Sequence, residues 1–197
     1  MKKIMESKKS LKLGQIVFLG STKLANMDLY DYLRDTTSFS IYNESVPKLK
    51  IEDLEKCVEM ISNLQPSKLF ISIGEEEIKN EKLDIEDFIS KYEWFLYKIN
   101  LNCKNCTLYI ISLSEENDIA KEVNRRLQRL AEECGCRFIK LIGNSICDFI
   151  STIKVYLRKF PINFVDKPTR QQKPCRAHYN EPTILLPYSR PNEQERK

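Results

Sequence analysis

The 197-residue sequence is long enough for one domain with a single sizeable core. Its hydrophobic residues (42%) and charged residues (30%) are typical of a soluble globular protein and exclude a disordered chain. The net charge is only +4 and the cations are interspersed with anions, which argues against nucleic acid as a partner because its binders usually carry a basic face.

The first twelve residues carry five lysines but lack the apolar centre of a secretory signal. No apolar run approaches the length that spans a bilayer, so no membrane partner is expected. The seven cysteines are an odd number and fall mostly within predicted elements, which favours reduced thiols. These features together predict a cytoplasmic protein.

Strands and helices are predicted to alternate five times. The first strand is a continuous apolar run, suited to burial on both faces, that ends at Gly20, and Ser21 and Thr22 are suited to cap the following helix. The strands are expected at residues 16–19, 38–42, 68–73, 107–112 and 137–142. The helices are expected to carry apolar faces over residues 24–33, 51–61, 85–99, 119–131 and 146–157.

Several helix boundaries carry their own signals. Asp84 is a predicted N-cap, Ser114 is expected to open the next helix, and Gly135 is a predicted C-cap. Strands and helices at this spacing indicate a three-layer α/β/α fold with a five-stranded parallel sheet. We divide the chain into a basic lead-in (1–13), an α/β domain (14–160) and an extended, proline-rich tail (161–197).

The tail contains one apolar patch, residues 184–188, with the sequence Ile-Leu-Leu-Pro-Tyr. This patch is expected to dock on the core or on a second subunit, which would make the protein a homo-oligomer. The alternative is a mostly mobile tail.

The order of these pieces resembles the SGNH (GDSL-type) hydrolases, a family of esterases, lipases and carbohydrate deacetylases with a flavodoxin-like fold. Residues 18–22, Phe-Leu-Gly-Ser-Thr, lie where that family has a strand followed by Gly-Asp-Ser. Residues 43–54 are similar to a second block that starts with Asn and leads into a helix. Residues 69–77 match an apolar strand followed by Gly-x-Asn-Asp, and residues 123–139 match the stretch before the last strand.

The resemblance implies site residues, and several depart from the family pattern. Thr22 takes the place of the nucleophile and Ser21 that of the family's Asp. The second-block glycine, which offers an N–H to the oxyanion, is replaced by Ser45 or Lys48. Glu76 aligns with an Asn that donates to the oxyanion, and a carboxylate there would repel the developing charge.

The general base is the largest departure. The family places Asp-x-x-His before its final helix, whereas residues 143–150 here contain Asp148 and no histidine. The only histidine of the chain, His178, lies in the tail.

The favoured hypothesis is therefore an SGNH-like domain that has lost the usual catalytic machinery and binds an unknown small molecule or protein partner. The predicted binding residues are Gly20, Asn43, Ser45, Gly74 and Glu76. One alternative is a divergent esterase or deacetylase that uses Ser21 or Thr22 with His178. A second alternative is a structural protein joined through the tail.

Two groups of residues could bind a metal ion, and each has a plainer interpretation. Glu75–Glu77 could offer carboxylates to a divalent cation, or form an exposed loop. Cys103-x-x-Cys106 and Cys134-x-Cys136 could hold zinc, but the second pair lacks the usual spacing. Small apolar residues near helix ends are the preferred interpretation of these cysteines, so no metal or other cofactor is predicted.

Two helical surfaces also stand out. Arg125, Arg126 and Arg129 lie beside glutamates and are expected to form exposed ion pairs. The helix around Trp94 is aromatic nearly all round, so part of it should be core and part an interaction surface.

Overall fold

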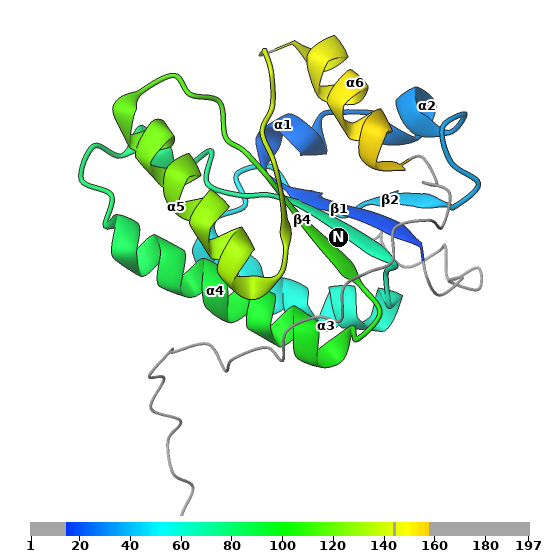
Figure 1. The fold of residues 1–197 in the computed structure, drawn as a ribbon, viewed down its shortest axis with the longest axis horizontal. Coiled ribbons are helices and arrows are strands. Elements are labelled where there is room, and N and C mark those ends of the chain that lie inside the picture. Colours follow the sequence, from blue (N-terminus) through cyan, green and yellow to red (C-terminus); the bar gives the residue numbers. More distant parts are fainter. Residues whose placement is uncertain (1–14, 144, 158–197) are drawn as a thin grey trace, which may run out of the picture.

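The computed structural model describes residues 15–143 and 145–157, which form one five-stranded parallel sheet in the order β2-β1-β3-β4-β5 (Figure 1). The basic lead-in, the tail patch and His178 lie outside the described residues. The strands are β1 (Ile16–Gly20), β2 (Ile41–Asn43), β3 (Lys68–Ser72), β4 (Thr107–Ile111) and β5 (Arg137–Ile139). The predicted parallel sheet is confirmed.

Helices cover both faces of this sheet, as predicted. The α-helices are α1 (Thr22–Ala25), α2 (Leu29–Leu33), α3 (Leu54–Leu64), α4 (Ile85–Asn102), α5 (Asp118–Cys134) and α6 (Ile146–Leu157). Two short 3₁₀ turns, η1 (Ile51–Asp53) and η2 (Glu77–Lys79), lie in the connections. In Figure 1, α3, α4 and α5 pack on one face and α1, α2 and α6 on the other, which gives three layers.

The alternation of side chains along β1 explains its continuous apolar sequence. Ile16 and Phe18 pack in the core beneath α1, α2 and α6, whereas Val17 and Leu19 pack in the core beneath α3, α4 and α5. All four are completely buried, because a parallel strand covered on both sides has no solvent face.

The helix predicted over residues 24–33 is wrong in one respect, because the structure has two short helices, α1 and α2, in its place. Asp28 begins α2 by accepting a hydrogen bond from the backbone of Asp31 at 3.2 Å. The Asn43 amide donates to the carbonyls of Leu24 and Met27, at 2.9 and 3.2 Å, where a continuous helix would use them itself. Side chains that bond the backbone locally in this way compete with helix continuation.

Other predicted boundaries need smaller corrections. The helix expected from Ser114 begins only at Asp118, because the Asn117 side chain accepts from the Ala120 N–H at 2.7 Å and caps it there. The second strand starts at Ile41, three residues late, and the fifth ends at Ile139, three residues early.

The predicted caps at the start of α4 and at the end of α5 are confirmed. The Asp84 side chain accepts from the Asp87 N–H at 3.1 Å, and Gly135 ends α5 in the left-handed conformation. Ser21 takes the N-cap position of α1 but makes no side-chain capping bond, which corrects the expected role of its hydroxyl.

The sheet order places the candidate site. After β1 the chain crosses to β2 on one side, and it later returns to add β3 on the other, so the loops that leave β1 and β3 diverge. Gly20 pairs with Ser72 in the register, and the Ser21 N–H donates to the Ser72 carbonyl at 3.3 Å. Ligands bind at such a switch point in open α/β sheets.

No helix within residues 15–143 and 145–157 is long and apolar enough to cross a membrane.

Candidate functional site

A cavity of about 370 Å³ opens at the carboxyl end of the sheet, next to β1, β3 and β4. Its lining comes from the segments that follow these three strands. The lining residues are Thr22, Lys23, Glu75, Glu76, Ile78, Lys79, Ser114, Glu116 and Asn117. We call this cavity the Thr22 pocket.

The Thr22 hydroxyl both accepts and donates a hydrogen bond. Its Oγ1 accepts from the backbone N–H of Lys48 at 3.0 Å, and it donates to Oε1 of Glu76 at 3.4 Å. Lys48 has a φ of 60°, a left-handed conformation that favours glycine. Of the two residues considered for the place of the second-block glycine, Lys48 is therefore the one that directs an N–H at Thr22.

Glu76 is held as a carboxylate by its neighbours. Lys79 Nζ lies 2.9 Å from the same Oε1 that faces Thr22. The hydrogen bond from Lys79 is the main reason why the pKa of Glu76 lies below its ordinary value, and the Thr22 hydroxyl adds to the effect. A negative charge therefore lies within hydrogen-bond reach of the Thr22 hydroxyl.

The other two carboxylates of this loop tie neighbouring segments together. Glu75 Oε2 accepts from the Lys23 N–H at 3.2 Å, at the start of α1. Glu77 Oε1 accepts from the Ile51 N–H at 2.6 Å, at the start of η1, and burial raises the pKa of both Glu75 and Glu77. Within the described residues, no group of three or more His, Cys, Asp or Glu side chains is placed to hold a metal ion.

The half-buried Glu77 carboxyl should affect how the stability of the protein depends on pH. Its pKa in the folded protein is raised by burial, so folding favours the protonated form. The stability it contributes is complete below the ordinary pKa of 4.5 and is lost as the pH rises through the folded pKa. Between about pH 5 and pH 7, the parent should therefore lose more unfolding free energy than Glu77→Gln.

Urea unfolding at both pH values measures this difference. The matched control is Glu81→Gln, at an exposed position of the following loop, which should follow the parent. Parallel pH profiles for the parent and Glu77→Gln would contradict the prediction.

Ser21, Asn43 and Ser45 do not line the Thr22 pocket. Ser21 is fully buried, and the hydroxyls of Ser21 and Ser45 find no hydrogen-bond partner within the described residues. The Asn43 amide is engaged by backbone groups of α1 and its exit, as described above. Of the predicted site residues, the structure brings Thr22 and Glu76 together in the pocket.

Gly20 and Gly74 shape the pocket from behind. A Cβ atom at Gly20 would lie 2.5 Å from Leu24 Cδ1, so only glycine lets α1 pack this closely against β1. Gly74 has a φ of 127° and turns the chain from β3 into the Glu75–Glu77 loop. Both positions support the site through backbone geometry.

The sequence did not identify Asn124 as a residue that shapes the site. Its side chain is buried, accepts from the Leu113 N–H at 2.8 Å and donates to the Leu113 carbonyl at 2.9 Å. These two bonds hold the chain where β4 leads into the pocket rim at Ser114. The available signal was an Asn next to Val123 on the otherwise apolar inner face of a helix.

The cysteines and arginines singled out in the sequence do not line the Thr22 pocket. Burial raises the pKa of the Cys106 thiol to about 12 and also raises that of Cys103, so both stay protonated at neutral pH. On α5, Glu122 pairs with both Arg125 and Arg126, which confirms the exposed ion pairs expected there.

Solved structures share this fold. The esterase EstA from Pseudoalteromonas, in a structure inhibited by monoethylphosphonate, is 11% identical, with a TM-score of 0.57 over 73% of this chain and 98% of that one. A GDSL-like lipase from Bacteroides thetaiotaomicron is 12% identical, with a TM-score of 0.56 over 72% of this chain and 85% of that one. A carbohydrate esterase family 2 enzyme from Myceliophthora fergusii is 9% identical, with a TM-score of 0.59 over 73% of this chain and 65% of that one.

These similarities show that the chain has an SGNH (GDSL-type) hydrolase-like fold. No protein-family model matches the sequence, and the search of curated proteins gives no match. The shared property is the fold, at identities far below those that indicate a common activity.

Proposed function

We propose that this SGNH-like domain has lost the hydrolase mechanism and uses the Thr22 pocket to bind a small ligand or a segment of a partner. The observation that carries the proposal is the Glu76 carboxylate, paired with Lys79, that accepts the Thr22 hydrogen bond. Two requirements of acyl transfer conflict with this arrangement, one for the base and one for the oxyanion.

The first requirement is a base that takes the proton of the nucleophile. A threonine hydroxyl needs such a base at hydrogen-bond distance. Here the group that accepts from Thr22 is Glu76, and Lys79 lowers its pKa, which makes it a weaker proton acceptor than an ordinary carboxylate.

The second requirement is stabilisation of a negative oxyanion. The Lys48 N–H points at Thr22 and could donate to such an oxygen. Glu76, however, brings negative charge to the place where a second donor is needed. Loss of one donor alone costs about 100- to 1000-fold in rate, and a carboxylate adds repulsion.

The charges of the pocket indicate the kind of ligand that it can hold. Lys23 and Lys79 line it together with Glu75, Glu76 and Glu116. Its volume of about 370 Å³ lies at the small end of the usual range for ligand sites. A small polar ligand with both an ammonium and a carboxylate group matches this lining.

Ester hydrolysis tests the loss of activity. We expect the full chain to hydrolyse p-nitrophenyl acetate and butyrate no faster than its Thr22→Ala variant. The matched control is Thr107→Ala, an exposed threonine at the opposite end of the sheet. Hydrolysis above this background that disappears in Thr22→Ala or Ser21→Ala would contradict the proposal and, if His178→Ala also abolished it, would support the divergent esterase.

Free amino acids probe the binding half of the proposal, because each carries an ammonium and a carboxylate. At least one is expected to raise the Tm of the full chain at millimolar concentration, since a ligand at 100 times its Kd adds about 2.7 kcal/mol. Lys79→Glu should abolish the shift, whereas Lys82→Glu, an exposed lysine three residues away, should keep it. Equal shifts in both variants would place the ligand elsewhere.

A further inference from the structure

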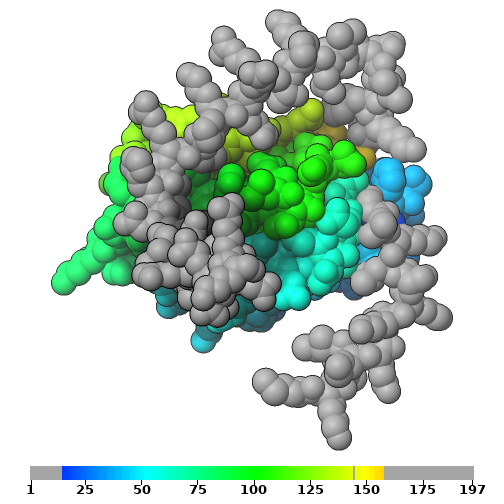
Figure 2. All heavy atoms as spheres, turned by 90° about the horizontal axis from the view of Figure 1, so that it is seen from below, coloured from blue at the N-terminus to red at the C-terminus, as the bar shows by residue number. Residues whose placement is uncertain are grey.

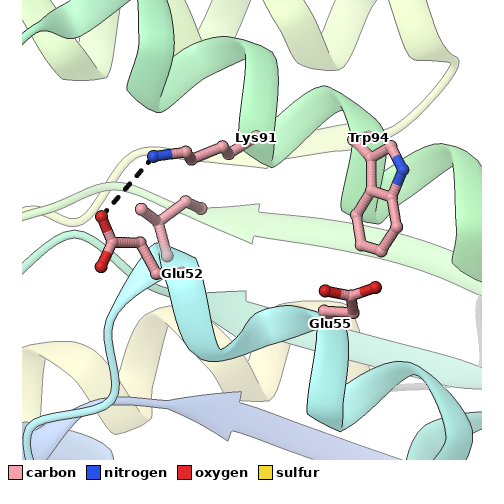
Figure 3. Close-up of a pocket in the computed structure, with 5 residues that line it drawn as sticks. Glu52, Glu55, Lys91 and Trp94 are labelled. Atoms are coloured by element: carbon pink, nitrogen blue, oxygen red, sulfur yellow. Dashed lines mark ion pairs between the residues drawn. The ribbon is translucent and has the colours of Figure 1, made fainter. Parts of the chain in front are cut away.

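A second cavity, of about 230 Å³, lies between α4 and the segment formed by η1 and α3. It is lined by Ile51, Glu52, Glu55, Lys91 and Trp94, and we call it the Trp94 groove. Figure 3 shows the Trp94 indole extending from α4 toward the Glu55 carboxylate on α3. In Figure 2, the chain near residue 60 and the chain near residue 100 adjoin on this side of the molecule.

Among the described residues, the groove presents one carboxylate without a partner, opposite an aromatic ring. Lys91 Nζ is neutralised by Asp87 at 2.6 Å and by Glu52 at 3.6 Å. Glu55 makes no hydrogen bond or ion pair with any residue in 15–143 or 145–157. Lys98 Nζ lies 5.5 Å from the centroid of the Trp94 ring, which shows that this ring already attracts a cation.

An arginine side chain fits these features better than other cations. Its planar guanidinium stacks on an aromatic ring while its N–H groups bond a carboxylate in the same plane. The volume of the groove, about 230 Å³, can accommodate one such side chain. A lysine ammonium would lose more hydration and gain no stacking.

The distribution of charge along the chain points to a source for this arginine. Residues 15–157 contain 18 Lys and Arg against 23 Asp and Glu, a net charge of −5. Residues 158–197 contain 9 Lys and Arg against 4 Asp and Glu, a net charge of +5. The positive charge of the C-terminal segment therefore complements the negative charge of the domain that precedes it.

An exposed apolar surface continues from the groove along α4. Tyr97 is 43% exposed and Leu101 is 52% exposed, and these residues lie one and two turns beyond Trp94. Helical residues at this spacing share one face. In the C-terminal segment, the apolar run Ile-Leu-Leu-Pro-Tyr at 184–188 is followed two residues later by Arg190.

We propose that the Trp94 groove binds the side chain of Arg190, with the apolar run 184–188 of the same molecule covering Tyr97 and Leu101. The length of the chain permits it. From Leu157, the end of α6, to residue 184 the chain can extend up to about 90 Å. A domain of this size has a radius of gyration of about 15 Å, so every face is within reach.

Trp94 is the only tryptophan of the chain, so its fluorescence reports on this groove alone. We would measure quenching by acrylamide, which is uncharged, on the full chain in about 0.15 M salt. Arg190→Glu and Glu55→Lys should each raise the quenching constant about twofold. The double variant should return only part of the way to the parent value, because the charges are then exchanged but the stacking of the guanidinium on Trp94 is lost. Glu55 is exposed, so Glu55→Lys should keep the parent's circular dichroism spectrum.

The matched control is Arg170→Glu, which makes the same charge reversal among polar neighbours of the same segment. It should leave the quenching constant unchanged. The proposal is overturned if Arg190→Glu has no effect, if Arg170→Glu has the same effect, or if the two charge reversals simply add. Protection of Trp94 that depends on protein concentration would also overturn it, because a second copy would then be the occupant.

Discussion

Phe70→Ala is expected to lower the unfolding free energy by about 4 kcal/mol. Phe70 is completely buried in the middle strand of the sheet, and its ring stacks on Phe18 at 4.7 Å and on Tyr109 at 4.5 Å between ring centroids. Removing the ring leaves a cavity beneath α6 and breaks a stack that crosses β1, β3 and β4. Urea unfolding followed by circular dichroism measures the loss.

Phe39→Ala is the matched control for Phe70. Phe39 is 40% exposed in the loop before β2, so the same truncation removes less buried surface and should cost under about 1 kcal/mol. Similar losses for the two variants would contradict the stabilising role assigned to the buried aromatic stack.

Asn124→Ala is expected to cost about 3 kcal/mol. The substitution leaves the N–H and the carbonyl of Leu113 buried without the Asn124 side chain that bonds both of them. The same bonds hold the chain that leads to Ser114 in the Thr22 pocket. We therefore expect any ligand of this pocket to bind Asn124→Ala more weakly at temperatures where the variant is still folded.

The matched control is Asn102→Ala, at an exposed asparagine in the last turn of α4. Its amide donates to the Lys98 carbonyl at 2.9 Å in solvent, where water can replace the bond. A loss under about 1 kcal/mol is expected. A cost for Asn124→Ala no greater than that of Asn102→Ala would contradict the role assigned to the buried amide.

The sheet could be predicted from the sequence because its strands are buried on both faces. Apolar runs such as that of β1 and the run that follows Lys68 leave little ambiguity about where strands lie. The alternation with amphipathic helices then limits the fold to a parallel, three-layer arrangement. The flavodoxin-like fold was predicted from the family resemblance, because periodicity alone does not specify which strands are neighbours.

Boundaries set by side chains from distant segments were harder to predict. The break between α1 and α2 depends on Asn43, which reaches back to the carbonyls of Leu24 and Met27. The late start of α5 depends on Asn117, although Ser114 is an equally good capping residue by type. Asn117 also donates to the Ile78 carbonyl at 3.1 Å, so in both cases the competing residue bonds a distant segment, which local propensity does not contain.

The site could be predicted in part. The resemblance assigned Thr22 and Glu76 to positions of one site, and in the structure Thr22 Oγ1 lies 3.4 Å from Glu76 Oε1. The role of Lys48 depends on its left-handed backbone conformation. Lysine rarely adopts this conformation, so the sequence does not predict it. The pairing of Lys79 with Glu76 was missed because an exposed lysine three residues along the chain is common and carries no signal by itself.

Reaction with an activated ethyl phosphonate tests most directly whether a nucleophile remains, because such reagents bond covalently to activated hydroxyls. The full chain would be incubated with the reagent and weighed by intact mass spectrometry, with a known serine esterase as the positive control. We expect the esterase to gain one phosphonyl group and this protein to keep its mass, since Glu76, the group that accepts from Thr22, is made a weaker proton acceptor by Lys79. A single adduct on Thr22 or Ser21, absent from the corresponding alanine variant, would contradict the loss of the hydrolase mechanism.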